Sequence, residues 1–337
     1  MAMNPAPAAA RVAEPMPWQR ERWRRLTQLQ DSGRLPHALL ISGPHGIGKQ
    51  PLVEALIART LCRNPGEIAC GECHGCRMLA AGYHPDLLSV APVEKSRQIR
   101  IDAIRQVNGF VSQTAQQGGY RVIRIEPAEA MNVAASNALL KSLEEPGERT
   151  LFVLVSDIAS RLLPTIRSRC QHWNLATPPA AEAERWLGER LGDTEEATFW
   201  LRVAGGLPLL AEELAGAEAR QLRQELRELF DSLVRGGEPV GEAARLDAQA
   251  LDRVLWYGIA WLEDLIRLGL SGDSRRVRNS DLLPLYRQAV KNARVRDWFR
   301  LLDYAREQRR LLAAGGNPNP QLVMEAWLIR WSALLRS

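Results

Sequence analysis

The chain has 337 residues, a formal net charge of +5, 46% hydrophobic residues and 25% charged residues. This balance excludes a disordered chain, and the longest apolar run, residues 254–262, is too short to span a bilayer. One hydrophobic core rarely organises so many residues, so we expect two or three domains. The arginines alternate with glutamates instead of forming a block, so the net charge alone does not indicate nucleic-acid binding.

The first segment, residues 1–16, is rich in Ala and Pro and lacks a charged start followed by an apolar core. We therefore expect a flexible tail rather than a signal peptide, and a cytoplasmic protein. An α/β domain is expected to follow over residues 17–176.

A glycine-rich segment, residues 43–50, reads Gly-Pro-His-Gly-Ile-Gly-Lys-Gln and follows the phosphate-binding pattern GxxxxGK[S/T] up to its last position. Before it, residues 37–42 suit a buried parallel strand, and after it residues 52–58 suit a helix. Strand, loop and helix thus come in the order that a phosphate-binding loop requires. The alternative is an ordinary glycine turn between a strand and a helix.

The loop predicts a defective nucleotide site, in which hydrolysis is not expected and ATP binding is doubtful. Gly43, Gly46 and Gly48 would bring backbone N–H groups close to phosphates, and Lys49 would add a positive charge. Gln50 replaces the hydroxyl residue that ligates Mg²⁺, and its longer amide cannot make the same compact contact. Hydrolysis is therefore not expected, while nucleotide binding by the degenerate loop stays open.

Four of the five cysteines, Cys62, Cys70, Cys73 and Cys76, lie close together in the chain. In a cytosolic protein this spacing favours a tetrahedral zinc site over disulfides. A [4Fe–4S] cluster is the second choice, and reduced cysteines without metal are the third. Four thiolate ligands leave no open position for water, so the predicted zinc module at residues 62–76 is structural.

An ATPase also needs an acidic pair at the end of a neighbouring strand. Residues 121–125 suit that strand, but Glu126 and Pro127 follow it in place of Asp-Glu. Pro127 has no side-chain base, so the group that would activate water is missing. Glu129 is expected in a solvated turn. The changes at Gln50 and Pro127 independently indicate a defective ATPase site.

The next elements are a helix, a strand and a short basic segment. Asn132 is a suitable N-cap for a helix that Pro146 would end. Residues 150–155 suit a further buried strand. Residues 164–170, Pro-Thr-Ile-Arg-Ser-Arg-Cys, then contain two arginines.

The rest of the chain has a helical pattern. Consecutive prolines at 178–179 mark a boundary, after which residues 177–217 are expected to form a small helical lid domain. Amphipathic helices are expected over residues 220–234 and 251–268, within a helical domain at residues 218–337. The broad apolar stripe of the last helix is explained by core packing or by contact with other subunits.

As an ordered set, these motifs resemble the clamp-loader subunits of the AAA+ superfamily. The set comprises the four-cysteine insertion after the loop helix, HPDL at residues 84–87, NALLKSLEEP at residues 137–146 and IRSRC at residues 166–170. The resemblance implies an α/β fold: an AAA+ P-loop domain with a parallel sheet and a zinc-binding insertion, then a small helical lid and a C-terminal all-α collar domain. Degenerate ATPase motifs beside an intact SRC motif are most similar to the non-hydrolysing subunits of bacterial DNA polymerase III.

The resemblance also implies roles for residues. In the motif Ser168-Arg169-Cys170, Arg169 would be an arginine finger that acts in trans on the ATP site of an adjacent motor subunit. Arg167 is instead expected in a structural ion pair, and Ser156 stands near the first polar sensor.

A protein of this kind is a non-catalytic subunit of a hetero-oligomer. Its implied partners are the clamp-loader motor subunits, the delta subunit, the sliding clamp and, through the complex, primer-template DNA, without any membrane. One alternative is an active AAA+ ATPase that uses Gln50 and Glu126 in modified roles. Another is a zinc-dependent nucleic-acid-binding module.

Overall fold

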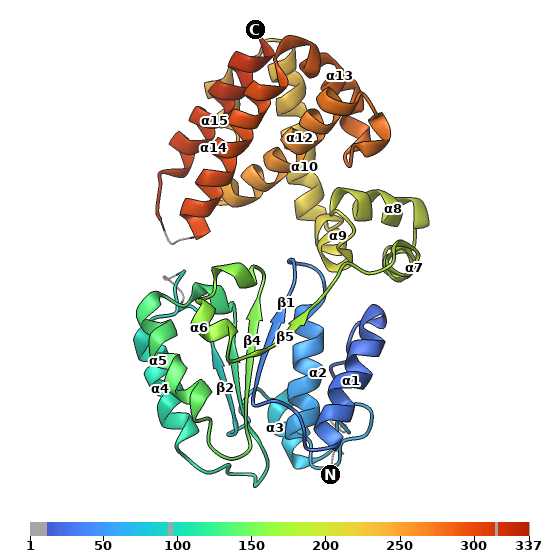
Figure 1. Cartoon of the computed structure of the whole chain (residues 1–337). Coiled ribbons are helices and arrows are strands. Elements are labelled where there is room, and N and C mark those ends of the chain that lie inside the picture. Colours follow the sequence, from blue (N-terminus) through green and yellow to red (C-terminus); the bar gives the residue numbers. More distant parts are fainter. Residues whose placement is uncertain (1–11, 94–96, 314–315, 337) are drawn as a thin grey trace, which may run out of the picture. The chain divides into compact units, whose positions relative to one another are not determined.

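The computed structural model describes residues 12–93, 97–313 and 316–336 (Figure 1). The first eleven residues of the expected tail lie outside the described residues, and Met16 at its other end is buried.

The chain divides into two compact units. The N-terminal unit comprises Met1–Arg190 with Gly206–Leu210, and the C-terminal unit comprises Leu191–Gly205 with Ala211–Ser337. The expected domain boundaries near residues 177 and 217 stay a prediction.

The N-terminal unit is built on one parallel sheet. In spatial order its strands are β2 (Leu87–Val90), β3 (Arg121–Ile125), β4 (Thr150–Ser156), β1 (Ala38–Ser42) and β5 (Gln171–Asn174). All neighbouring strands pair in parallel. Every residue of β1 and β4 is buried, as expected for central strands that are covered on both faces. The predicted parallel sheet is confirmed.

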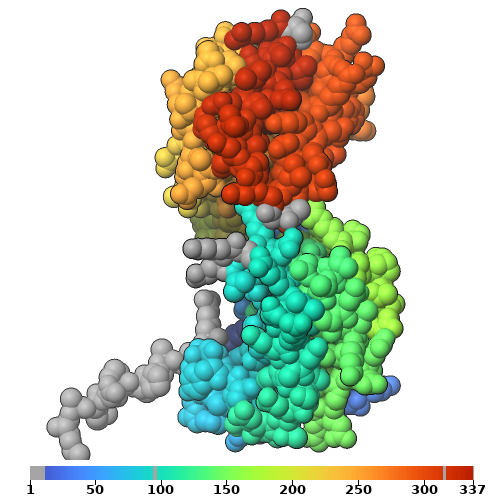
Figure 2. Space-filling view, turned by 90° about the vertical axis from the view of Figure 1, so that its left-hand side faces the viewer, coloured from blue at the N-terminus to red at the C-terminus, as the bar shows by residue number. Residues whose placement is uncertain are grey.

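Helices cover both faces of this sheet (Figure 1). The helices of this unit are α1 (Arg20–Asp31), α2 (Lys49–Leu61), α3 (His74–Ala80), α4 (Ile101–Val111), α5 (Val133–Glu144), α6 (Pro164–Arg167) and α7 (Ala180–Leu191), with 3₁₀ turns at Pro17–Gln19, Ala128–Ala130 and Ala159–Arg161. One apolar layer joins α4 and α5 to the sheet, and another joins α1 and α2 to it. Figure 2 shows α4 and α5 at the surface in teal and green, with the cysteine-rich segment beside them in light blue.

Helix α5 begins and ends where the sequence predicts. The Oδ1 atom of Asn132 accepts a hydrogen bond of 2.8 Å from the backbone N–H of Ala135, which satisfies one of the free donors of the first turn. The helix ends at Glu144, shortly before Pro146. Both the N-cap and the stop are confirmed.

The C-terminal unit is helical throughout its described residues. Its helices are α8 (Thr194–Val203), the end of α9 (Pro208–Leu214), α10 (Ala217–Val234), α11 (Pro239–Ala243), α12 (Leu251–Ser271), α13 (Leu283–Asn292), α14 (Val295–Ala313) and α15 (Pro320–Leu335), with 3₁₀ turns at Ala248–Ala250, Ser274–Arg276 and Ser280–Leu282. Long apolar stripes bury the faces on which these helices meet, and α12 packs against α13 and α14. No helix in the described parts of the chain is both long and apolar enough to cross a membrane.

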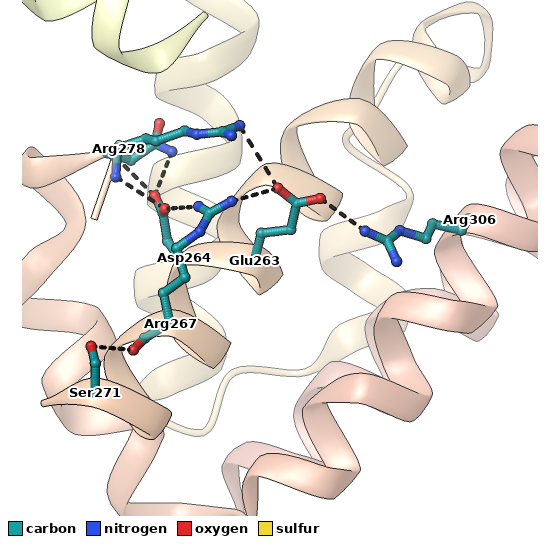
Figure 3. A network of polar contacts seen from close by, with 7 residues as sticks. Glu263, Asp264, Arg267, Ser271, Arg278 and Arg306 are labelled. Atoms are coloured by element: carbon teal, nitrogen blue, oxygen red, sulfur yellow. Dashed lines mark hydrogen bonds and ion pairs between the residues drawn. The ribbon is translucent and has the colours of Figure 1, made fainter. Parts of the chain in front are cut away.

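A fully buried carboxylate joins α12 to the segment after it (Figure 3). Asp264 accepts hydrogen bonds from Arg267 Nη1 at 2.9 Å and from the backbone N–H groups of Arg278 at 3.0 Å and Asn279 at 2.9 Å. The side-chain amide of Asn279 adds another at 2.8 Å. Because the buried charge is both paired and hydrogen-bonded, its desolvation is compensated, and the network fixes the path of the chain.

The neighbouring carboxylate extends this network to another helix. Glu263 lies 3.0 Å from Arg267 and 3.0 Å from Arg306 of α14 (Figure 3). The network therefore connects α12 to α14 as well as to the segment after α12. The hydropathy pattern of α12 does not reveal the contacts with Arg278, Asn279 and Arg306, because these partners lie 14 or more residues away in the sequence.

A glycine allows the ring of Trp327 on α15 to pack directly against α12. A Cβ atom at Gly258 would lie 2.1 Å from the ring of Trp327, which is buried. Since both helices are held by further contacts, a larger side chain here overpacks the core.

We predict that Gly258→Ala lowers the free energy of unfolding of the C-terminal unit by about 1–3 kcal/mol. Urea unfolding followed by tryptophan fluorescence measures this change. The matched control is Gly109→Ala in α4, where no atom lies within 4 Å of the added Cβ and the change should stabilise by about 0.5 kcal/mol. Equal effects of the two substitutions would show that the Trp327 contact does not constrain the packing.

Candidate functional site

The glycine-rich loop between β1 and α2 has the backbone that its sequence predicts. Gly43, Gly46 and Gly48 have φ angles of +155°, +81° and +98°, which other residues rarely adopt. A Cβ atom at Gly46 would lie 2.5 Å from the backbone nitrogen of Leu210, and the Gly46 carbonyl accepts a 3.0 Å hydrogen bond from the N–H of Leu209. The loop is therefore shaped by glycine and closely packed against its own chain.

The ammonium group of Lys49 is fully used inside the protein. Its Nζ atom donates to the carbonyl oxygens of Gly43 at 2.8 Å and Pro44 at 3.0 Å, and lies 2.6 Å from Oδ1 of Asp157. The lysine side chain is 7% exposed. A lysine ammonium has three N–H donors, so these partners leave none for a phosphate.

The carbonyl groups at the end of the loop are also occupied. Trp18 Nε1 donates to the carbonyl of Ile47 at 3.0 Å, and Gln19 Nε2 donates to the carbonyl of Gly48 at 2.8 Å. Both donors come from the segment that precedes α1. The loop thus serves as a junction between that segment, β1 and α2.

Sequence reasoning missed Asp157, although its position offered a signal. Ser42 at the end of β1 is paired in register with Ser156 at the end of β4. In a parallel sheet the carboxyl ends of neighbouring strands lie at the same edge, so the residue after β4 comes close to the loop after β1. Knowing that β4 neighbours β1 would have identified Asp157 as a partner for Lys49.

The acidic residues after β3 make other contacts. Glu126 Oε2 accepts a 2.7 Å hydrogen bond from Nε of Arg124, which lies on β3. Arg124 also lies 3.8 Å from Glu54 of α2. The carboxylate of Glu126 is therefore neutralised locally, whereas Lys49 pairs with Asp157. Gln50 is exposed in the first turn of α2.

The solvated turn predicted at Glu129 is wrong. Its Oε1 atom accepts a 2.9 Å hydrogen bond from the backbone N–H of Asp157, and its Oε2 atom is buried without a partner. The turn after β3 lies against the end of β4, which shields the Oε2 atom from water. Glu129 thereby helps to fix the backbone that carries the partner of Lys49.

The four cysteines converge at the end of α2. Cys62 follows α2, Cys70 lies in the connecting loop, Cys73 caps α3, and Cys76 lies in the first turn of α3. Their sulfur atoms all lie within 4.8 Å of one another, with Cys62–Cys70 at 3.5 Å and Cys70–Cys76 at 3.9 Å. Tetrahedral zinc with thiolate ligands places sulfur atoms about 3.8 Å apart. These four residues are able to bind a metal ion.

Backbone N–H groups surround the sulfur atoms. The N–H groups of Arg63 and Cys76 both donate to Cys73 Sγ at 3.5 Å. Burial alone would raise the pKa of Cys73, but these hydrogen bonds lower the pKa to about 6, which favours the thiolate. A Cβ atom at Gly75 would lie 2.5 Å from the carbonyl oxygen of Leu61, so only glycine allows α3 to approach the end of α2 this closely.

Arg169 follows α6 and is 35% exposed. Its Nε atom donates to Glu144 Oε1 at 2.8 Å, and its Nη1 atom donates to the carbonyl of Thr165 at 3.0 Å. The Oγ atom of Ser168 accepts a further bond from Nη1 at 3.4 Å. The neighbouring Cys170 packs in the core, where burial raises its pKa to about 12 and keeps the thiol neutral.

The ion pair expected for Arg167 is wrong. Within the described part of the chain Arg167 has no acidic partner, and its Nε atom is buried without a hydrogen bond. Its carbonyl oxygen contacts Nε2 of His172 at 2.8 Å. The arginines at 167 and 169 therefore have different surroundings, since Arg169 pairs with Glu144.

The fold and the loop together define an AAA+ type of P-loop protein: a five-stranded parallel sheet carries the loop after β1, and helices follow the sheet domain. A family model described as "DNA polymerase III, delta subunit" matches residues 18–179. A second, described as "DNA polymerase III, delta subunit, C terminal", matches residues 217–333.

Two relatives identified by sequence similarity agree with these family models. DNA polymerase III subunit delta' of Pseudomonas aeruginosa is 37% identical over 96% of this chain and 99% of its own length. The subunit of that name in Escherichia coli K12 is 35% identical over 77% of this chain and 80% of its own. A gamma subunit-related protein of Thermotoga maritima has a solved structure with a TM-score of 0.42 and 18% identity, covering 92% of this chain and 99% of that one. The chain belongs to the family of DNA polymerase III delta' subunits.

We predict that Asp157→Ala raises the affinity of the loop for Mg·ATP by about tenfold, because it frees one donor of Lys49 and removes a negative charge from the phosphate position. Isothermal titration calorimetry on the purified chain measures this affinity. Adding Lys49→Ala to the same chain should cancel the gain. An unchanged affinity after Asp157→Ala would mean that the ion pair does not restrict nucleotide binding.

Proposed function

We propose that this chain is a non-hydrolytic, stator-like subunit of the bacterial clamp loader. In the cytoplasm it would assemble with the ATPase motor subunits and the delta subunit, and help to place the sliding clamp on primed DNA. The names of its relatives support membership of a DNA polymerase III assembly. The observation that carries the non-hydrolytic role is the complete internal use of the Lys49 donors.

Three features of the loop and its surroundings support this role over an active ATPase. Gln50 offers no hydroxyl for Mg²⁺, and Pro127 offers no base for the attacking water. Lys49 pairs with Asp157, which takes a donor that a phosphate would need. An enzyme would need all three functions together, because positioning and charge stabilisation supply nearly all of phosphoryl-transfer catalysis.

Arg169 is the residue through which the chain would act on its neighbours. It is partly exposed on a turn anchored by the buried Cys170, so its backbone position is fixed while its side chain reaches the surface. A guanidinium group supplied from a neighbouring subunit stabilises the charge that develops on a transferring phosphoryl group. In this role the chain supplies a catalytic group without having a working ATP site.

We predict that Arg169→Ala leaves folding and assembly intact but slows ATP turnover at the neighbouring site by about 10³-fold or more. Steady-state ATP hydrolysis by the assembled complex with primed DNA measures this effect. The matched control is Arg161→Ala, which removes an exposed arginine shortly before α6 and should leave turnover unchanged. Normal turnover with Arg169→Ala would exclude the finger role.

We further propose that the four cysteines hold a structural zinc ion. The sulfur separations fit tetrahedral coordination, and backbone N–H groups already donate to the sulfur atoms. Four thiolates would fill the coordination shell, so the ion would contribute to stability rather than to chemistry. None of the four cysteines belongs to the two apolar layers on the sheet, although Ile68 of this module packs against one of them, and we expect the sheet to fold without the metal.

We predict that Cys73→Ser abolishes stoichiometric zinc binding and loosens residues 62–76, because a tetrahedral site loses one of four ligands. Metal analysis after gel filtration and limited proteolysis measure the two effects. Cys170→Ala, which changes the cysteine outside the cluster, should retain the metal. Loss of the circular dichroism signal of the whole chain in Cys73→Ser would show that the module is required for global folding.

A further inference from the structure

The guanidinium group of Arg169 is bound almost completely by its own chain. It has five N–H donors. Glu144 accepts hydrogen bonds from Nε and Nη2, and the Thr165 carbonyl and Ser168 hydroxyl accept bonds from Nη1. A phosphate is normally held by two parallel N–H groups of an arginine. Only one N–H lacks a partner among the described residues, so this conformation cannot make that contact.

A negative charge at the position of Glu144 is unfavourable for the helix unless the ion pair with Arg169 compensates for it. It is the last residue of α5, where the helix dipole disfavours negative charge. Glu145 follows it, yet only Glu144 contacts Arg169. The helix itself is fixed by its Asn132 cap and by the buried Leu143, so the carboxylate is presented at a defined place.

We propose that Glu144 is a positioning residue that latches the arginine finger in its resting state. When a neighbouring subunit presents ATP, Arg169 exchanges the Glu144 carboxylate for oxygens of the terminal phosphate. The inference rests on the proposed function, because it assumes that Arg169 acts in trans. It assigns a role to the end of the NALLKSLEEP motif, which the finger role alone leaves unexplained.

The exposure and the charges of Arg169 and Glu144 are consistent with the exchange of the carboxylate for a phosphate. The side chains of Arg169 and Glu144 are 35% and 51% exposed, so water and salt weaken their attraction and the pair opens readily. A phosphate brought beside the carboxylate would be repelled by it, which favours release of Glu144 from the arginine. The Thr165 carbonyl carries no full charge and can stay in contact with Nη1 throughout.

The test uses the assembled complex with its motor subunits, without clamp or DNA. The measured quantity is the Arg169-dependent ATP turnover, which is the difference between each complex and the same complex carrying Arg169→Ala. We expect Glu144→Gln to raise this turnover about two- to fivefold at low salt. This factor corresponds to the free energy that an exposed ion pair contributes. Glu145→Gln, the same chemical change one residue away, should leave it unchanged.

The salt dependence of ATP turnover distinguishes a latch from a contact that only stabilises the fold. The ratio of turnover in Glu144→Gln to turnover in the unaltered complex should fall toward one between about 0.05 and 0.5 M salt, because screening opens the ion pair in the unaltered chain. A structural defect would give a ratio that salt does not restore. Thermal unfolding of Glu144→Gln checks that the fold is intact.

Each outcome decides the matter. If Arg169→Ala slows turnover but Glu144→Gln leaves it unchanged or lowers it, the latch is overturned and the finger role stands. If Arg169→Ala has no effect, the finger role itself fails and the latch fails with it. A rise in Glu144→Gln that disappears in the double variant with Arg169→Ala supports both.

Discussion

The three hydrogen-bond donors of Lys49 are the constraint on which the rest of this structure depends. In a phosphate-binding loop they would meet a nucleotide, but here two loop carbonyls and Asp157 accept them. The ion pair links the end of β4 to the start of α2, and Glu129 holds the backbone of Asp157 in place. The loop thus serves as an internal junction between the end of β4 and the start of α2.

In the proposed role, the sheet supports groups that act on a neighbouring subunit. The apolar layer that packs α4 and α5 on the sheet includes Cys170, so the turn carrying Arg169 is anchored in the same core. Glu144 at the end of α5 then meets that arginine at the surface. The C-terminal unit is stabilised separately by the buried Asp264 and its partners. Each unit therefore has its own polar network in addition to its apolar core.

Sequence patterns predicted the features that depend on residues close together in the chain. The strand, loop and helix around Lys49, the cap at Asn132 and the clustering of the cysteines all follow from local spacing. The partner of Lys49 could not be read in this way, because Asp157 reaches it only through the pairing of β1 with β4. The errors at Glu129 and Arg167 have the same cause: tertiary packing, which local polarity does not encode, decides whether a charged side chain meets water.

The most direct test of this account is ATP hydrolysis by the purified chain alone in the presence of Mg²⁺. The complete internal use of the lysine donors predicts no turnover above that of the Lys49→Ala variant. Turnover that is present in the unaltered chain and lost in Lys49→Ala would contradict the account, because the lysine would then have to release Asp157 and bind phosphate.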